Sequence, residues 1–203
     1  QEFNLFANQA QMDIFEQYFY DLNQFGRISG NNKTYADPIN ILQDKLDVFK
    51  KRLNLSNANN NVFDLPSLYY RYIIALTNDA KEIKKVSIEK AMLAAQAPLT
   101  KPTLSRPIYY IDQNNRINIE PSSINTAEFY FYKKPEKAEW SGYNVGGAFQ
   151  YNDTNSTDFE LHISEETKLV IKILGLAGIT LKDPGLYQIA GAEDNKNIQQ
   201  EKQ

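Results

Sequence analysis

The sequence contains no cysteine, one histidine and no long apolar run, and each absence removes a class of protein. Without cysteine, the chain cannot form disulfides, thiolate nucleophiles or Cys-ligated metal sites. The single histidine, His162, excludes a metal site built from several histidines of one chain. No stretch approaches the roughly 18 apolar residues of a membrane span, and residues 1–8 have no basic segment before an apolar core. We therefore expect no bound metal, no secretory signal and no membrane partner.

The remaining composition is that of an ordinary globular protein. Hydrophobic residues make up 42% of the 203 positions and charged residues 23%, which is enough for one sizeable core or two small ones. The formal net charge of -3 argues against a dedicated nucleic-acid binder, because neutralising phosphates requires clustered Lys and Arg. The 13 tyrosines and 11 phenylalanines suit either a core or an interface, since aromatic side chains bury large areas in both.

Both ends of the chain show helical periodicity. Residues 5–24 place apolar side chains at helical spacing, and a Gly- and Asn-rich segment at 26–33 ends this helix. Asp37-Pro38 predicts the start of a second helix, which ends at the basic residues 50–52. Near the C-terminus, Asp183-Pro184 opens a final helix in the same way.

The helix before that final one is predicted from its cap and its apolar face. Ser164 is the expected N-cap and Gly178 the expected C-cap. The apolar residues at helical spacing are Leu169, Val170, Ile173, Leu174 and Ala177. We expect this face to be buried, so that replacing Leu174 by Asp prevents folding.

The middle of the chain is rich in strand signals. Residues 68–77, 82–87, 108–112, 116–120 and 126–133 are predicted as strands, with turns at residues 78–80 and at Asn114-Asn115. Ser87 is predicted to cap a short helix that ends near Gln96, and residues 135–158 are predicted as a long loop. The sequence thus predicts an α+β fold, with residues 1–62 and 159–203 as a helical body and residues 63–158 as an inserted β-rich lobe.

The sequence offers no complete catalytic or cofactor-binding motif. Gly146-Gly147 and residues 175–178 lack the lysine and the spacing of a phosphate-binding loop, so we interpret these glycines as structural. His162 precedes a predicted helix cap and is interpreted as a surface or satisfied histidine rather than a general base. The remaining candidates are carboxylates, which are Glu165-Glu166, Glu193-Asp194, and Asp13 with Glu16 and Asp21. Adjacent helical residues point about 100° apart, and charged helix faces are usually solvated, so we predict no catalytic, cofactor-binding or metal-ligating residue.

Seven segments resemble one family of virion proteins. They are residues 3–11 (FNLFANQAQ), 15–19 (FEQYF), 65–71 (LPSLYYR), 107–110 (PIYY), 117–121 (INIEP), 130–135 (YFYKKP) and 172–179 (KILGLAGI), supported by Trp140 and Asp183-Pro184. Together these segments resemble the connector subunits that join head to tail in crAss-like phages and related tailed bacteriophages.

The resemblance implies a non-enzymatic structural protein of the virion, made in the cytoplasm of the host bacterium. It implies a homo-oligomeric ring of about twelve copies that contacts the portal protein or an adjacent ring, receives tail proteins, and lets DNA pass without specific binding. Two alternatives remain open. One is another virion component, such as a tail tube, baseplate or capsid decoration, and the other is a non-catalytic binding module that uses Trp140 and tyrosines as stacking platforms.

Overall fold

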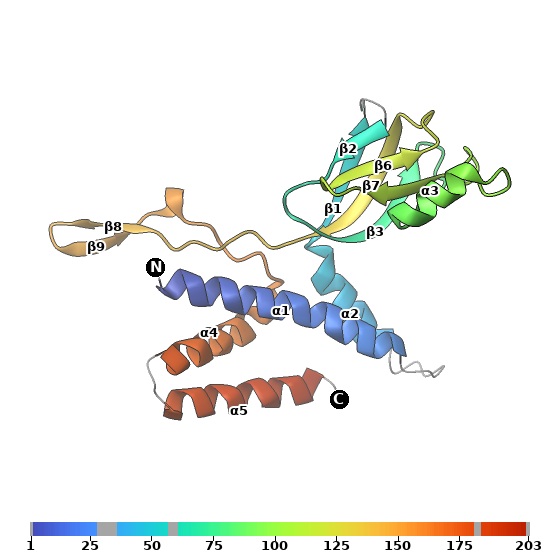
Figure 1. Ribbon diagram of the computed structural model, residues 1–203. Helices are drawn as coiled ribbons and strands as arrows, with labels where there is room; N and C mark the ends of the chain where they lie inside the picture. Colours follow the sequence, from blue (N-terminus) through green and yellow to red (C-terminus); the bar gives the residue numbers. More distant parts are fainter. Residues whose placement is uncertain (1, 28–35, 57–60, 181–183, 202–203) are drawn as a thin grey trace. The chain divides into compact units, whose positions relative to one another are not determined.

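The computed structural model describes residues 2–27, 36–56, 61–180 and 184–201, and within them the chain forms an α+β fold (Figure 1). The chain divides into two compact units. The helical unit consists of Gln1–Val48 and Pro135–Gln203, and the β unit consists of Phe49–Lys134. The β unit is therefore inserted between the two parts of the helical unit in sequence, as the predicted fold class requires.

The helical unit contains α1 (Glu2–Arg27), α2 (Ala36–Asp47), α4 (Glu166–Thr180) and α5 (Pro184–Glu201). Helix α1 contacts both α2 and α4, and α4 also packs along α5. The buried side chains lie at helical spacing, and on α1 they include Ala7, Ala10, Ile14, Phe15 and Tyr18. A Cβ added to Gly175 would lie 3.5 Å from the Cβ of Ala190, so glycine here lets α4 and α5 approach closely.

The β unit contains two sheets that enclose one core. Strands β1 (Lys50–Ser56), β7 (Thr126–Lys133) and β3 (Tyr69–Thr77) form an antiparallel sheet with β7 in the centre. The second sheet has the order β2 (Val62–Asp64), β6 (Arg116–Glu120), β5 (Ile108–Ile111) and β4 (Lys84–Lys85), and only its β4–β5 pair is parallel. Helix α3 (Ile88–Gln96) contacts β5.

The core of the β unit is aromatic and aliphatic. Side chains from both sheets and from the adjoining loops meet there, namely Leu55, Phe63, Ala75, Ile83, Tyr109, Ile117, Ile119, Ile124, Ala127, Phe129 and Phe131. Burial raises the pKa of the Tyr109 hydroxyl well above its usual range. On β7, buried residues alternate with half-buried ones, so one face of the central strand points into this core.

Several local predictions are confirmed. The strands at 69–77, 108–111, 116–120 and 126–133 agree with the predicted segments. The turn residues Ala80 and Asn115 have positive φ angles of 57° and 56°, and the Ser87 hydroxyl accepts a hydrogen bond of 3.4 Å from the Lys90 amide at the start of α3.

Other predictions are wrong at the ends of elements. Residues 50–52 begin strand β1 rather than end a helix, because α2 stops at Asp47. The predicted strand 82–87 is reduced to Lys84–Lys85, and α4 continues past Gly178 to Thr180. The first turn before α4 is capped by His162 rather than Ser164.

The predicted apolar face of α4 is only partly correct. Leu169 is buried, but Val170 and Leu174 are 50% and 45% exposed, since α1 and α5 cover other sides of the helix. Burial of Leu174 is therefore a wrong prediction. The predicted cap Asp183 lies outside the described residues, and α5 begins at Pro184.

The boundaries between the units also differ from the predicted ones at residues 62 and 158. Strand β1 pairs with β7 over its whole length, which places residues 50–56 in the β unit. The segment after Pro135 is attached to α1 and therefore belongs to the helical unit.

Candidate interaction surface

The acidic side chains that the sequence singles out do not gather at one site. Among the described residues, no three His, Cys, Asp or Glu side chains gather in a way that would hold a metal ion. Asp13 accepts a hydrogen bond from Gln9, and Asp21 accepts one from Gln17. Glu16 and Glu166 are exposed, and Glu193 pairs with Lys196 at 3.8 Å.

His162 is an N-cap. Its Nδ1 accepts a hydrogen bond of 3.3 Å from the Ser164 amide and lies 2.9 Å from the Ser164 hydroxyl. This places His162 at the start of the 3-10 turn Ile163–Glu165, which leads into α4. The histidine ring therefore orders the entry to α4, in line with its interpretation as a satisfied side chain.

Glu165 forms a buried ion pair. Its side chain is 1% exposed, its Oε1 lies 2.5 Å from the Lys45 ammonium of α2, and its Oε2 lies 3.9 Å from that of Lys168 on α4. The Lys45 ammonium also lies 5.9 Å from the centre of the Tyr18 ring on α1. The carboxylate thus links α2 to the start of α4, and Lys45 extends the contact to α1, so Glu165 contributes to the packing of the helical unit.

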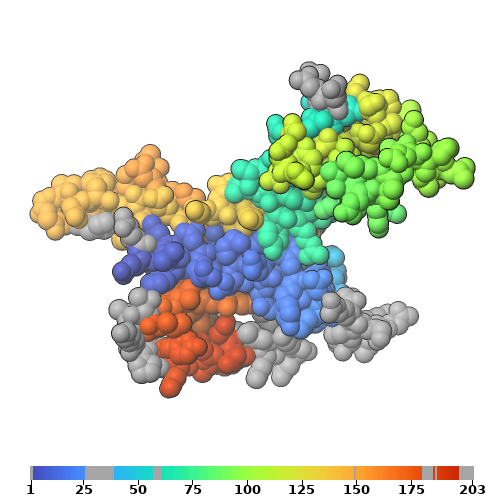
Figure 2. All heavy atoms as spheres, viewed as in Figure 1, coloured from blue at the N-terminus to red at the C-terminus, as the bar shows by residue number. Residues whose placement is uncertain are grey.

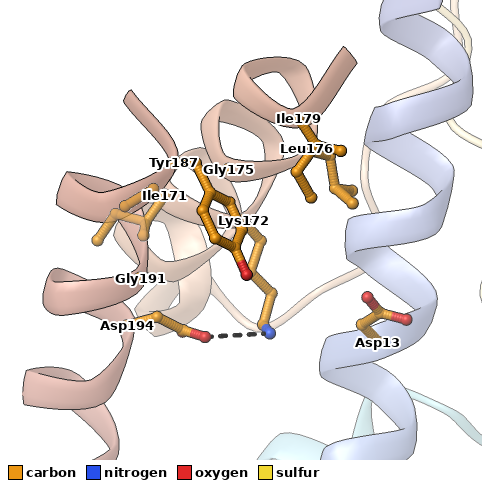
Figure 3. Close-up of a pocket in the computed structure, with 10 residues that line it drawn as sticks. Asp13, Ile171, Lys172, Gly175, Leu176, Ile179, Tyr187, Gly191 and Asp194 are labelled. Carbon is orange, nitrogen blue, oxygen red and sulfur yellow. Dashed lines mark hydrogen bonds and ion pairs between the residues drawn. The ribbon is translucent and has the colours of Figure 1, made fainter. Parts of the chain in front are cut away.

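A shallow groove lies where α1, α4 and α5 meet (Figure 3). Its volume is about 240 Å³, below the roughly 300 Å³ at which ligand pockets begin. Lys172 of α4 pairs with Asp194 of α5 at 3.4 Å, and Asp13 points from α1 toward the same space. The volume of the groove is therefore smaller than that of a typical small-molecule site, and its Lys172 ammonium is already paired with Asp194.

The main surface feature is an arm formed by residues 139–158. The arm contains the hairpin of β8 (Gly142–Val145) and β9 (Ala148–Tyr151), followed by the 3-10 turn Asp153–Asn155. Glu139 and Thr157 pair as an isolated antiparallel bridge at its base. The sequence predicted a loop here, which is wrong for the hairpin.

Three amide side chains of α1 hold the segment that leads into the arm. Asn4 donates a hydrogen bond to the Trp140 carbonyl and accepts one from the Trp140 amide. Asn8 donates to the Ala138 carbonyl at 2.8 Å, and Gln11 donates to the Glu136 carbonyl at 2.8 Å. Positions 4, 8 and 11 share one helix face, so α1 presents a row of amides to an extended chain.

Gln11 also binds the returning segment, since its Oε1 accepts a hydrogen bond of 3.0 Å from the Glu160 amide. The segment 136–140 runs antiparallel to α1, because later residues bind earlier helix positions. Asn4 lies only two residues after the start of α1, so the hairpin extends past that end of the helix, as Figure 1 shows.

The hairpin is shaped by its turn. Gly146 and Gly147 have φ angles of 59° and 86°, the left-handed conformation that both central residues of a type I′ turn require. Tyr143 and Val145 alternate along β8 and share one face, and both are about half exposed. Among the described residues, β8 and β9 pair only with each other, so both outer edges keep unpaired backbone groups.

Aromatic side chains cover the base of the arm. The ring of Trp140 stacks on Tyr151 with 6.5 Å between centroids, and Phe3 of α1 meets Trp140 edge-on at 6.2 Å. The adjacent pocket has a volume of only about 120 Å³. Trp140 is nevertheless 51% exposed, so its outer surface is open to a partner.

The helices of the described residues include none that is long and apolar enough to cross a membrane. Comparison of the chain with models of known protein families gives no match, and comparison with curated proteins gives none.

Proposed function

We propose that this chain is a non-enzymatic structural subunit of a tailed bacteriophage, assembled as a ring in the head-to-tail connector. In this role about twelve copies surround the DNA channel, contact the portal protein or an adjacent ring, and receive the tail. The proposal combines the resemblance of seven sequence segments with the surface of the arm.

The arm is the structural feature that best supports the proposal. A two-stranded hairpin is marginally stable by itself, and an exposed strand edge favours pairing with another chain. The arm nevertheless extends past α1 with exposed Trp140, Tyr143, Val145 and Tyr151. Aromatic side chains of this kind are enriched at protein interfaces. A subunit that is complete only in an assembly accounts for such an arm.

The charge of the chain fits the same role. A net charge of -3 avoids the strong phosphate contacts that would slow DNA in a channel. The same proposal places the chain in the virion, which is assembled in the cytoplasm of the host bacterium.

Two other functions are compatible with an exposed aromatic arm. A tail-tube, baseplate or decoration protein also needs contacts between subunits, and copy number separates these from a connector ring. A carbohydrate-binding module would use Trp140 and Tyr151 for stacking. The pocket beside these rings holds only about 120 Å³, which disfavours that function.

Quantitative mass spectrometry of purified particles tests the proposal. The copy number of this chain is measured relative to the portal subunit of the same particle. A ratio near one supports the connector ring. A large excess assigns the chain to the tail tube or capsid, and absence from the particle refutes a virion role.

A further inference from the structure

We propose that the arm of one subunit docks on a basic and apolar surface around α3 of the next copy of the same chain. The inference rests on the proposed ring function and names the two surfaces that would build the ring. A head-to-tail contact joins two different patches, and successive copies form a closed ring when the rotation between them closes.

The receiving surface, here called the α3 surface, comprises residues 81–106 of the β unit. It exposes four large apolar side chains that the β unit leaves uncovered. They are Met92 and Leu93 on α3, and Leu99 and Leu104 in the loop that follows. Leu99 is 88% exposed. Exposed apolar side chains grouped in this way mark interaction sites more often than scattered ones do.

The same surface is strongly basic. It carries six exposed cations, Lys81, Lys84, Lys85, Lys90, Lys101 and Arg106, against the two acids Glu82 and Glu89. Lys84, Lys85 and Lys90 line one shallow concavity at the start of α3. Leu93 follows Lys90 by three positions, so a cation and an apolar side chain share one helix face.

The arm has the complementary chemistry. Residues 139–158 include Glu139, Asp153 and Asp158, all exposed, and no Lys or Arg. Its exposed apolar side chains, which include Tyr143 and Val145, lie between these acids in sequence. An acidic and aromatic projection therefore matches a basic and aliphatic surface in both charge and apolar character. In Figure 2 the arm is drawn in yellow to orange and the α3 surface in green.

A further exposed apolar surface, on α4 and α5, lacks this complementarity. Val170, Leu174, Tyr187 and Ile189 are exposed there. The charged side chains described there that are not buried are Glu166, Glu193 and Asp194 against Lys172 and Lys196, so this surface has no excess of positive charge to attract the arm. Of these two surfaces, charge therefore favours the α3 surface as the docking site for a second copy.

The test uses two variants of the full chain, each blocked on one surface. The arm variant carries Tyr143→Lys and Val145→Lys, and the α3 variant carries Met92→Glu and Leu93→Glu. All four positions are exposed, so both variants keep their cores, which circular dichroism checks. Ile189→Lys, at a position that is also exposed, is the matched control.

Sedimentation velocity follows self-association up to about 100 µM, where an interface with a micromolar Kd is largely occupied. We expect the wild-type chain and the Ile189→Lys control to associate. Each blocked variant alone is expected to associate at least about thirty-fold more weakly, the effect of losing one interface hot spot. An equimolar mixture of the two variants is expected to form heterodimers and nothing larger, because it contains one intact arm and one intact α3 surface per pair.

The inference is overturned if both blocked variants associate like the wild type, or if their mixture stays monomeric while the wild type associates. A wild-type chain that stays monomeric over the whole range also overturns it, including the case in which the α3 surface binds DNA instead. None of these results alters the copy number measured in particles, so failure of the docking contact and failure of the ring function are distinguishable.

Discussion

Replacing Glu165 by glutamine tests whether the buried ion pair holds the helical unit together. The change removes the negative charge but keeps the size of the side chain. Lys45 and Lys168, whose side chains are 12% and 7% exposed, then lose their carboxylate partner. Removing one member of a buried ion pair typically costs about 3–5 kcal/mol, because the remaining charge loses an interaction that offset its burial.

The expected loss corresponds to a fall in Tm of roughly 6–20 °C for a chain of this size. The assay can be confined to the helical unit, since the chain has one tryptophan and Trp140 belongs to that unit. Denaturant unfolding followed by tryptophan fluorescence therefore reports this unit rather than an average over two units.

Glu166→Gln is the matched control, because Glu166 is the next residue and is exposed. We expect it to change the free energy of unfolding by less than about 0.5 kcal/mol. The triple variant Lys45→Met, Glu165→Leu, Lys168→Met should recover most of the stability lost in Glu165→Gln, since apolar side chains of similar volume need no charge compensation. If Glu165→Gln unfolds within about 1 kcal/mol of the wild type, this reasoning is wrong.

Three further predictions concern other parts of the chain. Leu174→Asp should give a folded protein by circular dichroism, because Leu174 is 45% exposed. Leu169→Asp should not fold, because Leu169 is 6% exposed. Similar spectra for the two variants would contradict this expectation. Backbone hydrogen bonds, of which that from the Arg116 amide has the largest effect, lower the pKa of the Asp112 carboxyl. The ionised carboxylate should therefore stabilise the fold fully above the usual pKa of Asp, and this stabilisation should disappear as the pH falls through the lowered pKa. Carbon-detected NMR titration of Asp112 checks the direction, and a midpoint at or above 3.8 would refute it. Gly147→Ala should raise amide hydrogen exchange in the β8–β9 hairpin about 5- to 30-fold, because its φ of 86° disfavours a side chain, and an unchanged rate would exclude that strain.

The strands of the β unit were predictable because their signals are local. Residues 69–77 and 126–133 are rich in β-branched and aromatic side chains, and the turn at Asn114-Asn115 joins two short alternating segments. Strand β1 was missed because its partner β7 lies about 75 residues later in the chain. Its first residues, Lys50, Lys51 and Arg52, suit an exposed edge strand as well as they suit the end of a helix.

The sequence of the arm contains a local signal for its hairpin. Two glycines at 146 and 147, with Tyr143-x-Val145 before them and an alternating segment after them, are typical of a two-residue hairpin turn. The attachment of the arm to α1 had no such signal. Asn4, Asn8 and Gln11 read as an ordinary polar helix face, and only the fold brings residues 136–140 against them.

The burial of Glu165 was likewise not predictable from the sequence. Two adjacent glutamates at the start of a helix suggest a favourable interaction with the helix dipole, and this explanation fits the exposed Glu166. Lys45, the closer partner of Glu165, lies 120 residues earlier, so the ion pair depends on how α2 packs in the helical unit.

The amide row on α1 has a consequence for the entropy of binding. An extended segment without a neighbouring strand would sample many conformations, and a partner would have to order it on contact. Asn4, Asn8 and Gln11 satisfy its backbone groups as an adjacent strand would, so the direction of the hairpin is set before any partner arrives. Much of the ordering cost then falls on folding rather than on association, and a modest contact area can give a stable contact.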